Sequence, residues 1–577
     1  MRRLGAATMA LGLLGSASLA RSDGTVTLCG TDVAAGPAGQ INLAQAIARG
    51  GRITFQCGAG ATIRVTQQHT VSAPIEIDGG NEVLLDAQDI TSMFAATATA
   101  SPVVFRNIVL RDGPSSFGAP GAGTTFGGIF AGPVTLELQN VTVEATRAPI
   151  AAEAVDVYAS RFTGNQGPVL RARTVRVSGS TVFEDNDGPP FTPLVDGGGN
   201  FSSGSATVED GIFRLNGPIA WNGSLAIRRS SFVSNGRGAS NGGALSVTGQ
   251  ASIEKTEFTN NTARDGGAIW LSGSLLELRR SQFRSNRAER RGGAIAVSLT
   301  GASRASVAYT NFTGNTAENG GAISLADMPT FGGRIEGHAL TFVRNVATNS
   351  GGAIYAAEGA VHLSRVLFLE NGAGTAGAVY GGIMSGDLLL RMGNALVVRT
   401  VAGGALRGSN IELVNSTIAD NAGAGITLLP QSPLDIPGTV PTLKLTNTLV
   451  LNNAGGNCAP VPTPGTLVDG GSNLQFPGRD CGDAIRAVDP VLDSFYVPVV
   501  DSPARFAGNN QVCVEDPLVR ARDIFGESRP EGPRCTIGAI ERDLHRLAML
   551  SLRRRREGPA QDVARRMFER LGLGRRP

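Results

Sequence analysis

The chain has 577 residues, of which 78 are glycine and only 5% are aromatic, and its formal net charge is +3. Length alone would predict several domains at roughly 150 residues each. An even spread of small, turn-forming residues is more typical of a solenoid, in which added length adds repeats and not domains. The composition therefore argues against a string of separate globular domains.

The first residues, 1–20, are typical of an export signal peptide. Arg2 and Arg3 give a positive start, residues 4–14 form a short apolar run, and Ala20 suits cleavage after it. A transmembrane anchor needs about 20 apolar residues, and neither this run nor any other stretch is long enough. We therefore predict an exported protein that is secreted, extracellular or held at the outer cell surface, with the periplasm as an alternative.

Residues 21–60 are predicted to form an N-terminal cap and the start of a solenoid that occupies residues 61–453. Residues 41–49 carry apolar side chains at helical spacing. A short helix there would cover the first coil, whose open edge would otherwise leave strand groups unpaired.

The clearest repeats lie over residues 160–410, where two motifs alternate. The first is F-x-x-N, at Phe162/Asn165, Phe183/Asn186, Phe213/Asn216, Phe232/Asn235, Phe258/Asn261, Phe283/Asn286, Phe312/Asn315, Phe342/Asn345 and Phe368/Asn371. The second is G-G-A followed by an apolar residue, with its alanine at Ala244, Ala268, Ala294, Ala322 and Ala353, and in looser form at Ala378 and Ala405. Successive alanines are 24 to 31 residues apart, and self-similarity at such a period marks a solenoid.

The residues around each motif predict strands. After each motif alanine, buried-type and mixed residues alternate, as in Ile269, Trp270 and Leu271, which is typical of a strand with one buried face. Stacked units would form long parallel sheets with about 4.8 Å between strands. Within them we expect Phe to fill the interior, Asn to hold a turn and form a ladder of side chains, and paired glycines to allow a tight turn.

The two motifs together resemble the repeat of chlamydial polymorphic outer membrane proteins. That resemblance implies an all-β, single-stranded right-handed parallel β-helix of the pectate-lyase-like class. Near the other end, D-x-x-G-x-x-R-P followed by C-x-I-G-A-x-E is similar to the segment called choice-of-anchor Q, at Asp523, Gly526, Arg529, Pro530, Cys535, Ile537, Gly538, Ala539 and Glu541. In that family the segment often precedes a surface-sorting tail. The resemblance implies fold and export, and no settled activity.

The six cysteines form three pairs of near neighbours in the sequence: Cys29 with Cys57, Cys458 with Cys481, and Cys513 with Cys535. This grouping favours three local disulfides over the other possible pairings, and disulfides persist in oxidising compartments. No pair has C-x-x-C spacing, so we expect no metal site.

The C-terminal part divides into two segments of different composition. Residues 454–541 are rich in Gly, Pro and Asp and are predicted to form an irregular, disulfide-pinned cap. Residues 542–577 hold eleven arginines against four acidic residues. This basic tail would contact an anionic surface, or would simply be a solvated end.

Enzymes that cleave polysaccharides require particular acid and base residues, and we searched the sequence for them. A lyase needs an Arg or Lys base and charge neutralisation, often by calcium, and a hydrolase needs two carboxylates about 5 to 9.5 Å apart. Just before G-G-A, successive units place charged residues that should cluster at one turn: Arg264, Asp265, Arg290, Arg291 and Glu318. They are weak catalytic candidates, and the alternative is a set of exposed ion pairs worth about 0 to 1 kcal/mol each.

A second column of residues suits binding. Two positions after each motif alanine stand Ser246, Trp270, Ala296, Ser324, Tyr355, Tyr380 and Arg407. Alternation points this column away from the core, with the two tyrosines on adjacent coils and Trp270 three coils before Tyr355. Exposed aromatic rings on a rigid surface stack on sugar rings, whereas the alternative is that they pack beneath a neighbouring loop.

We therefore predict a monomeric exported protein that binds a polysaccharide or a surface protein without cleaving it, in an adhesin-like or structural role. The alternative is a polysaccharide lyase or glycoside hydrolase acting on an acidic polysaccharide. We expect no cofactor, calcium being possible only for a lyase, and no nucleic-acid partner.

Overall fold

The computed structural model describes residues 24–114, 128–147, 150–192, 204–236, 238–298, 304–326, 333–356, 359–381, 390–430 and 440–541. The predicted signal peptide at 1–20 and the basic tail at 542–577 lie outside the described residues. The chain forms two compact units, Met1–Arg161 and Phe162–Pro577.

The first unit contains the predicted helix near its start. Helix α1 (Leu43–Arg49) starts in a capping box, in which the Asn42 side chain accepts a hydrogen bond from the backbone N–H of Gln45 at 2.8 Å and the Gln45 side chain accepts one from the backbone N–H of Asn42 at 3.1 Å. Its buried residues Leu43, Ala46 and Ile47 pack over β1 (Gly24–Val26) and β4 (His69–Val71). A disulfide joins Cys29 to Cys57 beside this helix.

Behind the helix, strands of successive coils pair in parallel. The series is β1, β2 (Gly51–Phe55), β5 (Ile75–Asp78), β8 (Val103–Arg111), β9 (Phe130–Glu144) and β10 (Ile150–Tyr158). Their inward positions, such as Ile53, Ile77 and Phe105, are buried. The unit is therefore a stack of parallel coils with a continuous apolar interior.

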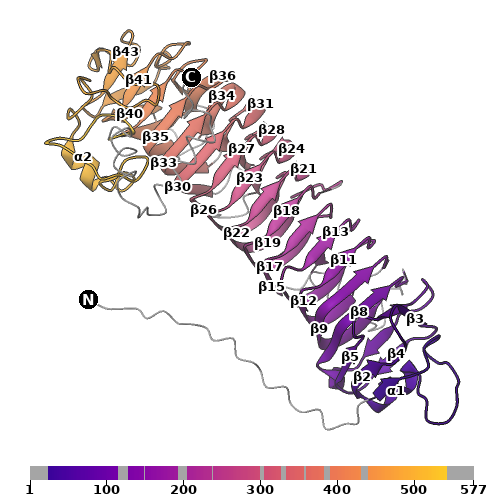
Figure 1. The fold of residues 1–577 in the computed structure, drawn as a ribbon. Helices are drawn as coiled ribbons and strands as arrows, with labels where there is room; N and C mark the ends of the chain where they lie inside the picture. Colours follow the sequence, from indigo (N-terminus) through magenta and orange to yellow (C-terminus); the bar gives the residue numbers. More distant parts are fainter. Residues whose placement is uncertain are drawn as a thin grey trace, which may run out of the picture. The chain divides into compact units, whose positions relative to one another are not determined.

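The second unit repeats one coil of three strands. A typical coil contains β20 (Glu257–Thr259), β21 (Thr262–Asp265) and β22 (Ile269–Arg279), and the next contains β23 (Gln282–Arg284), β24 (Arg287–Arg291) and β25 (Ile295–Ser298). Each strand pairs in parallel with its counterpart on the following coil, and Figure 1 shows β21 beside β24. The predicted parallel β-helix is confirmed.

The motif phenylalanines form one interior column. Rings from Phe162 to Phe368 stack nearly parallel, with neighbouring centroids 4.5 to 5.1 Å apart. All nine rings are buried. This stack is the apolar core on which the coils are built.

The motif asparagines form the expected ladder, and every member is buried. Asn286 is typical: its Nδ2 donates to the Phe258 carbonyl on the preceding coil and to Asn315 Oδ1 on the following one, each at 3.0 Å. Its Oδ1 accepts from the side-chain and backbone N–H groups of Asn261 at 2.9 and 3.0 Å. Both donors and both lone pairs of the amide are thus used within the protein.

The paired glycines form the tight turn, here called the glycine corner, that precedes the last strand of each coil. Gly266 has φ +63°, a left-handed conformation that favours glycine. A Cβ on the next residue, Gly267, would lie 2.2 Å from the carbonyl oxygen of Gly293 on the following coil. The first glycine therefore makes the turn, and the second lets two coils approach closely.

After each glycine corner comes one long sheet, which we call the post-glycine sheet. Its strands are β19 (Leu245–Glu254), β22, β25, β29 (Ile323–Ala326), β32 (Ile354–Ala356), β34 (Gly372–Gly381) and β36 (Ala402–Gly408), paired in that order. The strands before the corner, here called the middle strands, include β21, β24, β28 (Thr316–Asn319) and β31 (Val346–Ser350).

The segment predicted as an irregular cap continues the coil before it becomes irregular. Strands β42 (Thr466–Asp469), β43 (Leu474–Phe476) and β44 (Arg486–Ala487) still pair in parallel with their neighbours. Beyond them the chain is irregular apart from α2 (Asn510–Glu515), and disulfides join Cys458 to Cys481 and Cys513 to Cys535. In Figure 1, α2 lies beside the labelled strands β35 (Leu390–Val398) and β40 (Thr442–Thr446).

This irregular part also covers the flank of earlier coils. The cap residues Val497, Ala504, Ile524, Ile537 and Ile540 share one buried cluster with solenoid residues Val343, Leu367, Leu369, Leu396, Val398, Leu449 and Leu451. The reason is local: outward positions beside Phe283 are Gln282 and Arg284, whereas those beside Phe368 are Leu367 and Leu369. An apolar outer face on these coils requires a cover.

A buried ionic cluster fixes the end of the cap. Arg529 and Glu541 have fully buried side chains, with Arg529 Nε 3.4 Å from Glu541 Oε2, and both Arg529 Nη atoms donate to the Gly538 carbonyl at 3.1 Å. Asp523 accepts backbone N–H groups of Phe525, Glu527 and Glu541 at 2.9 to 3.1 Å. Burial raises the pKa of both carboxyl groups, and the arginine opposes this shift.

Candidate functional site

The outward column of the post-glycine sheet is in the predicted register. Ser246 pairs with Trp270, and the series continues through Ala296, Ser324, Tyr355, Tyr380 and Arg407 on successive coils. On the same strand the flanking residues Ile269 and Leu271 are fully buried, whereas Trp270, Tyr355 and Tyr380 are partly exposed. The three aromatic residues therefore lie on the same face of the sheet, whereas Ala296 and Ser324, which stand between them in the column, are buried.

Tyr355 and Tyr380 form a stacked pair. Their ring centroids are 5.3 Å apart and their planes differ by 19°. Burial raises the pKa of Tyr380, while the positive charge of Arg407 on the next coil opposes the shift. Because the two rings stack on each other across adjacent coils, each ring covers one face of the other.

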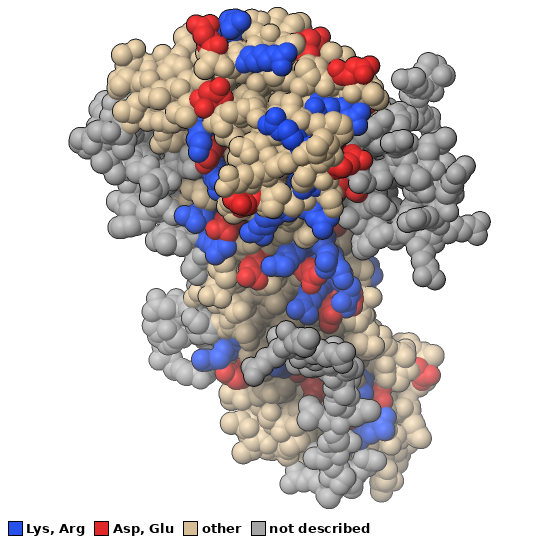
Figure 2. Space-filling view, turned by 90° about the vertical axis from the view of Figure 1, so that its left-hand side faces the viewer, with Lys and Arg blue, Asp and Glu red and all other residues tan. Residues whose placement is uncertain are grey.

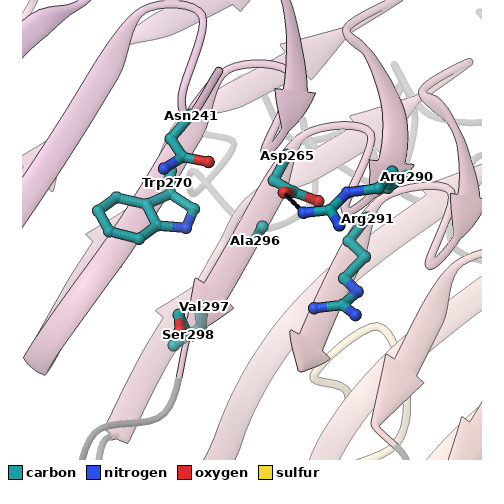
Figure 3. Close-up of a pocket in the computed structure, with 8 residues that line it drawn as sticks. All are labelled: Asn241, Asp265, Trp270, Arg290, Arg291, Ala296, Val297 and Ser298. Atoms are coloured by element: carbon teal, nitrogen blue, oxygen red, sulfur yellow. Dashed lines mark hydrogen bonds and ion pairs between the residues drawn. The ribbon is translucent and has the colours of Figure 1, made fainter. Parts of the chain in front are cut away.

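A pocket lies beside Trp270, on the same sheet, with a cavity volume of about 220 Å³. Its lining residues are Asn241, Asp265, Trp270, Arg290, Arg291, Ala296, Val297 and Ser298. Figure 3 shows Trp270 on one side, Ala296 between, and the Asp265 and arginine side chains opposite. The pocket thus joins the post-glycine strands β22 and β25 to the middle strands β21 and β24 across the glycine corner.

A bulge in β24 sets the charges of this pocket. β24 has five residues and β21 four, and their register shifts between Ala263 and Asp265, so that Asp265 pairs with Arg291. The neighbouring Arg290 side chain reaches Asp265 and forms an ion pair with its Oδ2. This hydrogen bond holds the pKa of Arg290 above its usual value.

The Asp265–Arg290 pair leaves hydrogen-bonding capacity unused. The Asp265 side chain is 9% exposed, and its Oδ1 has no hydrogen-bond partner among the described residues. Arg290 Nε is likewise shielded and without a partner there. A buried acceptor left unpaired costs about 1 to 3 kcal/mol, so the pocket holds an unmet donor and an unmet acceptor.

The structure separates the five charged candidates into two groups. Asp265, Arg290 and Arg291 come together in the pocket with Trp270. Arg264 and Glu318 are exposed on the middle strands and are not among the residues lining the described pocket. Sequence patterns indicated the charged cluster and the aromatic column separately; their meeting was not predicted, although only Gly266 to Ile269 separate Asp265 from Trp270.

The ionisable side chains that line the described pocket are one carboxylate and two arginines. Its one lining carboxylate, Asp265, is paired with an arginine, whereas glycoside hydrolysis uses two carboxyl groups. Among the described residues, no group of three or more His, Cys, Asp or Glu side chains is placed to hold a metal ion. The described part of the chain also contains no helix long and apolar enough to cross a membrane.

A second depression, of about 430 Å³, lies at the turns that carry Arg229, Lys255 and Arg280. Two of these cations are paired: Arg229 with Glu209 and Asp210, and Arg280 with Glu254. Basic and acidic side chains also lie next to one another on the face drawn in Figure 2. These exposed pairs contribute little binding or stability each.

The first unit contains a buried pair of ionisable side chains, His69 and Asp32. In the first unit, His69 Nε2 lies 2.8 Å from Asp32 Oδ2, and both side chains are buried. Burial lowers the pKa of His69, and the Asp32 carboxylate opposes this shift. Thr66 also donates to Asp32 at 2.7 Å, so this pair holds the first coils together.

Comparison with known proteins gives one family match and two distant structures. Residues 255–272, 309–326 and 339–357 match a family model described as the Chlamydia polymorphic membrane protein repeat. No curated protein matches the chain. Among solved structures, the catalytic domain of a GH87 α-1,3-glucanase in complex with tetrasaccharides has 12% identity and a TM-score of 0.21, with 76% of this chain and 68% of that chain covered. The PL6 family alginate lyase AlyGC has 10% identity and a TM-score of 0.17, with 79% and 100% covered.

Proposed function

We propose that this chain is an exported cell-surface or extracellular protein whose post-glycine sheet binds glycans without cleaving them. The observation that carries the proposal is the outward column in which Trp270, Tyr355 and Tyr380 stand on one sheet, with a polar pocket beside the tryptophan. Three disulfides suit an oxidising compartment. The matched repeat is described for a membrane protein, which supports a place at the cell surface.

A rigid sheet favours this kind of binding. Aromatic rings offer a large apolar surface with few rotatable bonds, and they are frequent contact centres in binding sites. Here the backbone beneath them is held by parallel pairing on both sides. Little conformational entropy is therefore lost when a ligand binds.

The experiment is a retention assay on a panel of insoluble polysaccharides with the double variant Tyr355→Ser/Tyr380→Ser. Each stacking ring should contribute on the order of 1 kcal/mol or more, so retention should weaken clearly while the unfolding temperature stays almost unchanged. The matched control is Tyr158→Ser/Tyr309→Ser. These two tyrosines are 57% and 52% exposed, and they lie outside the post-glycine sheet.

Two outcomes would overturn the proposal. If the double variant loses thermal stability and keeps its glycan retention, the rings are packing residues. If the wild type releases unsaturated uronides that absorb in the ultraviolet, the protein is a polysaccharide lyase, and the binding role gives way to catalysis.

A further inference from the structure

The Trp270 pocket limits the size of what it can hold. Its volume of about 220 Å³ is below the roughly 300–1,000 Å³ of sites for drug-sized ligands, so it fits one ring and not several. The Trp270 indole forms a side wall, and Ala296 occupies the next position of the outward column. Alanine stands where two later coils carry tyrosine, so no second aromatic ring occupies this position of the pocket lining.

The unpaired polar atoms that line the pocket indicate which hydrogen bonds a ligand would make. Asp265 Oδ1 lacks a donor, and Arg290 Nε lacks an acceptor, among the described residues. A hydroxyl group both donates and accepts, so neighbouring hydroxyls can satisfy both atoms. A ligand carboxylate cannot donate to Asp265 Oδ1, and an ammonium group cannot accept from Arg290 Nε, whereas hydroxyl groups satisfy both atoms.

We propose that the Trp270 pocket is a subsite for one uncharged sugar ring of a glycan, which stacks on Trp270, donates a hydroxyl hydrogen bond to Asp265 and accepts one from Arg290. This inference rests on the proposed glycan-binding function and narrows it to neutral glycans at a defined place. A single-ring site has few contacts, so the expected dissociation constant is on the order of 1 mM.

Tryptophan fluorescence gives a local readout for this site. The chain has two tryptophans, and Trp221 is 2% exposed with its Nε1 hydrogen-bonded to the Ser224 carbonyl at 3.1 Å. Trp221 therefore supplies a constant background, and a ligand in the pocket changes the emission of Trp270. The probes are cellotetraose, maltotetraose and mannotetraose, with tetragalacturonate as the acidic counterpart.

Three variants test the assignment. Ala296→Phe fills the space beside Trp270, and Asp265→Ala removes the acceptor; each should weaken binding of the neutral tetrasaccharide at least tenfold. The second variant keeps the test valid if the first does not fold. Thr313→Phe, an equal substitution at an exposed position of β27 (Asn311–Thr313), should bind like the wild type.

The outcomes separate this inference from the broader function. Binding of a neutral tetrasaccharide that is lost in Ala296→Phe and Asp265→Ala supports it. Exclusive binding of tetragalacturonate, unchanged binding in both variants, or no fluorescence response to any neutral probe overturns it. If polysaccharide retention still depends on Tyr355 and Tyr380 in that case, the proposed glycan-binding function stands; if the wild type retains no polysaccharide, that function fails as well.

Discussion

At the scale of single residues, identical side chains on adjacent coils satisfy one another. Phe283 stacks between Phe258 and Phe312, with centroid separations of 4.7 and 5.0 Å. Its neighbours along the strand, Gln282 and Arg284, point outward, so the ring is the strand's whole contribution to the interior. A substitution there affects three coils at once.

We predict that Phe283→Ala lowers the free energy of unfolding by about 3 to 5 kcal/mol, because the cavity left between two rings cannot collapse fully. Phe283→Leu keeps most of the volume and should cost clearly less. Urea denaturation of the two variants measures the difference. A cost below about 1 kcal/mol for the alanine variant would show that the ring is not packed in a continuous column.

Arg529 is a second residue whose role depends on burial. Its side chain is fully buried beside Glu541. Burial lowers its pKa, whereas the negative charges of Glu541 and Asp523 act to raise it. Removing one partner of a buried ion pair costs about 3 to 5 kcal/mol, because the remaining charge is left uncompensated.

We therefore predict that Arg529→Met destabilises the cap by several kcal/mol, to be measured by hydrogen exchange of the amides in residues 488–541. Arg486→Met changes an exposed arginine of β44 and should have almost no effect. Equal protection in the two variants would contradict a structural role for the buried arginine.

At the scale of elements, the cap is fastened to the flank of the solenoid by polar contacts as well as apolar ones. Arg391 in β35 pairs with Asp516 at 2.7 Å, Asn394 donates to the Arg522 carbonyl at 2.8 Å, and Arg365 in β33 (Gly359–Leu369) donates to the Ile524 carbonyl at 3.3 Å. The positive charge of Arg365 also acts on His338 in β30 (Gly333–Val343). The Nδ1 atom of His338 lies 2.8 Å from Ser364 Oγ.

This arrangement gives a pH dependence with a defined sign. Burial, together with the charges of Arg365 and Arg520, lowers the pKa of His338 to about 4, whereas the unfolded value is about 6.5. Between these values the unfolded chain binds more protons, so stability falls as pH drops from about 6.5 to 4 and is unaffected by this group above that window. The effect stays well under about 1.4 kcal/mol per pH unit because the ring is partly solvated.

The prediction is tested with His338→Asn, which places an amide near the Nδ1 position and cannot titrate. The unfolding temperature of this variant should fall less than that of the wild type between pH 6.5 and 4. Comparing the two chains removes the contribution of Asp523 and Glu541, whose raised pKa values act in the opposite direction. Parallel pH profiles would show that His338 is freely protonated in the folded protein.

At the scale of the whole second unit, the irregular cap covers an apolar surface on the flank of several coils. The apolar flank formed by Leu367, Leu369, Leu396 and Val398 is buried in one cluster with cap residues that include Ile524, Ile537 and Ile540. Exposed apolar surface of this kind promotes association between chains, and an uncovered solenoid end adds unpaired strand groups.

A chain that ends at Ala487 should therefore self-associate, whereas one that ends at Glu541 should remain monomeric. Light scattering coupled to size-exclusion chromatography measures the difference. A monomeric chain after removal of residues 488–541 would show that the cap is dispensable as a cover for the flank.

The sequence by itself determined the repeated architecture. F-x-x-N and G-G-A recur because each coil must place a ring inside, satisfy a turn and pass a tight corner. Parallel stacking keeps the same register from coil to coil, so the outward order of Trp270, Tyr355 and Tyr380 could be read directly from the motif spacing. The three local disulfides followed from cysteine grouping in the same way.

Only the tertiary structure decided what these periodic features do together. The one-residue bulge in β24 sends Arg290 to Asp265 and closes the pocket beside Trp270. The return of residues 488–541 along the flank depends on contacts between residues more than a hundred positions apart, such as Asn394 with Arg522. The repeat determines which features recur from coil to coil, whereas the side chains that meet at the β24 bulge or across a long-range contact depend on packing.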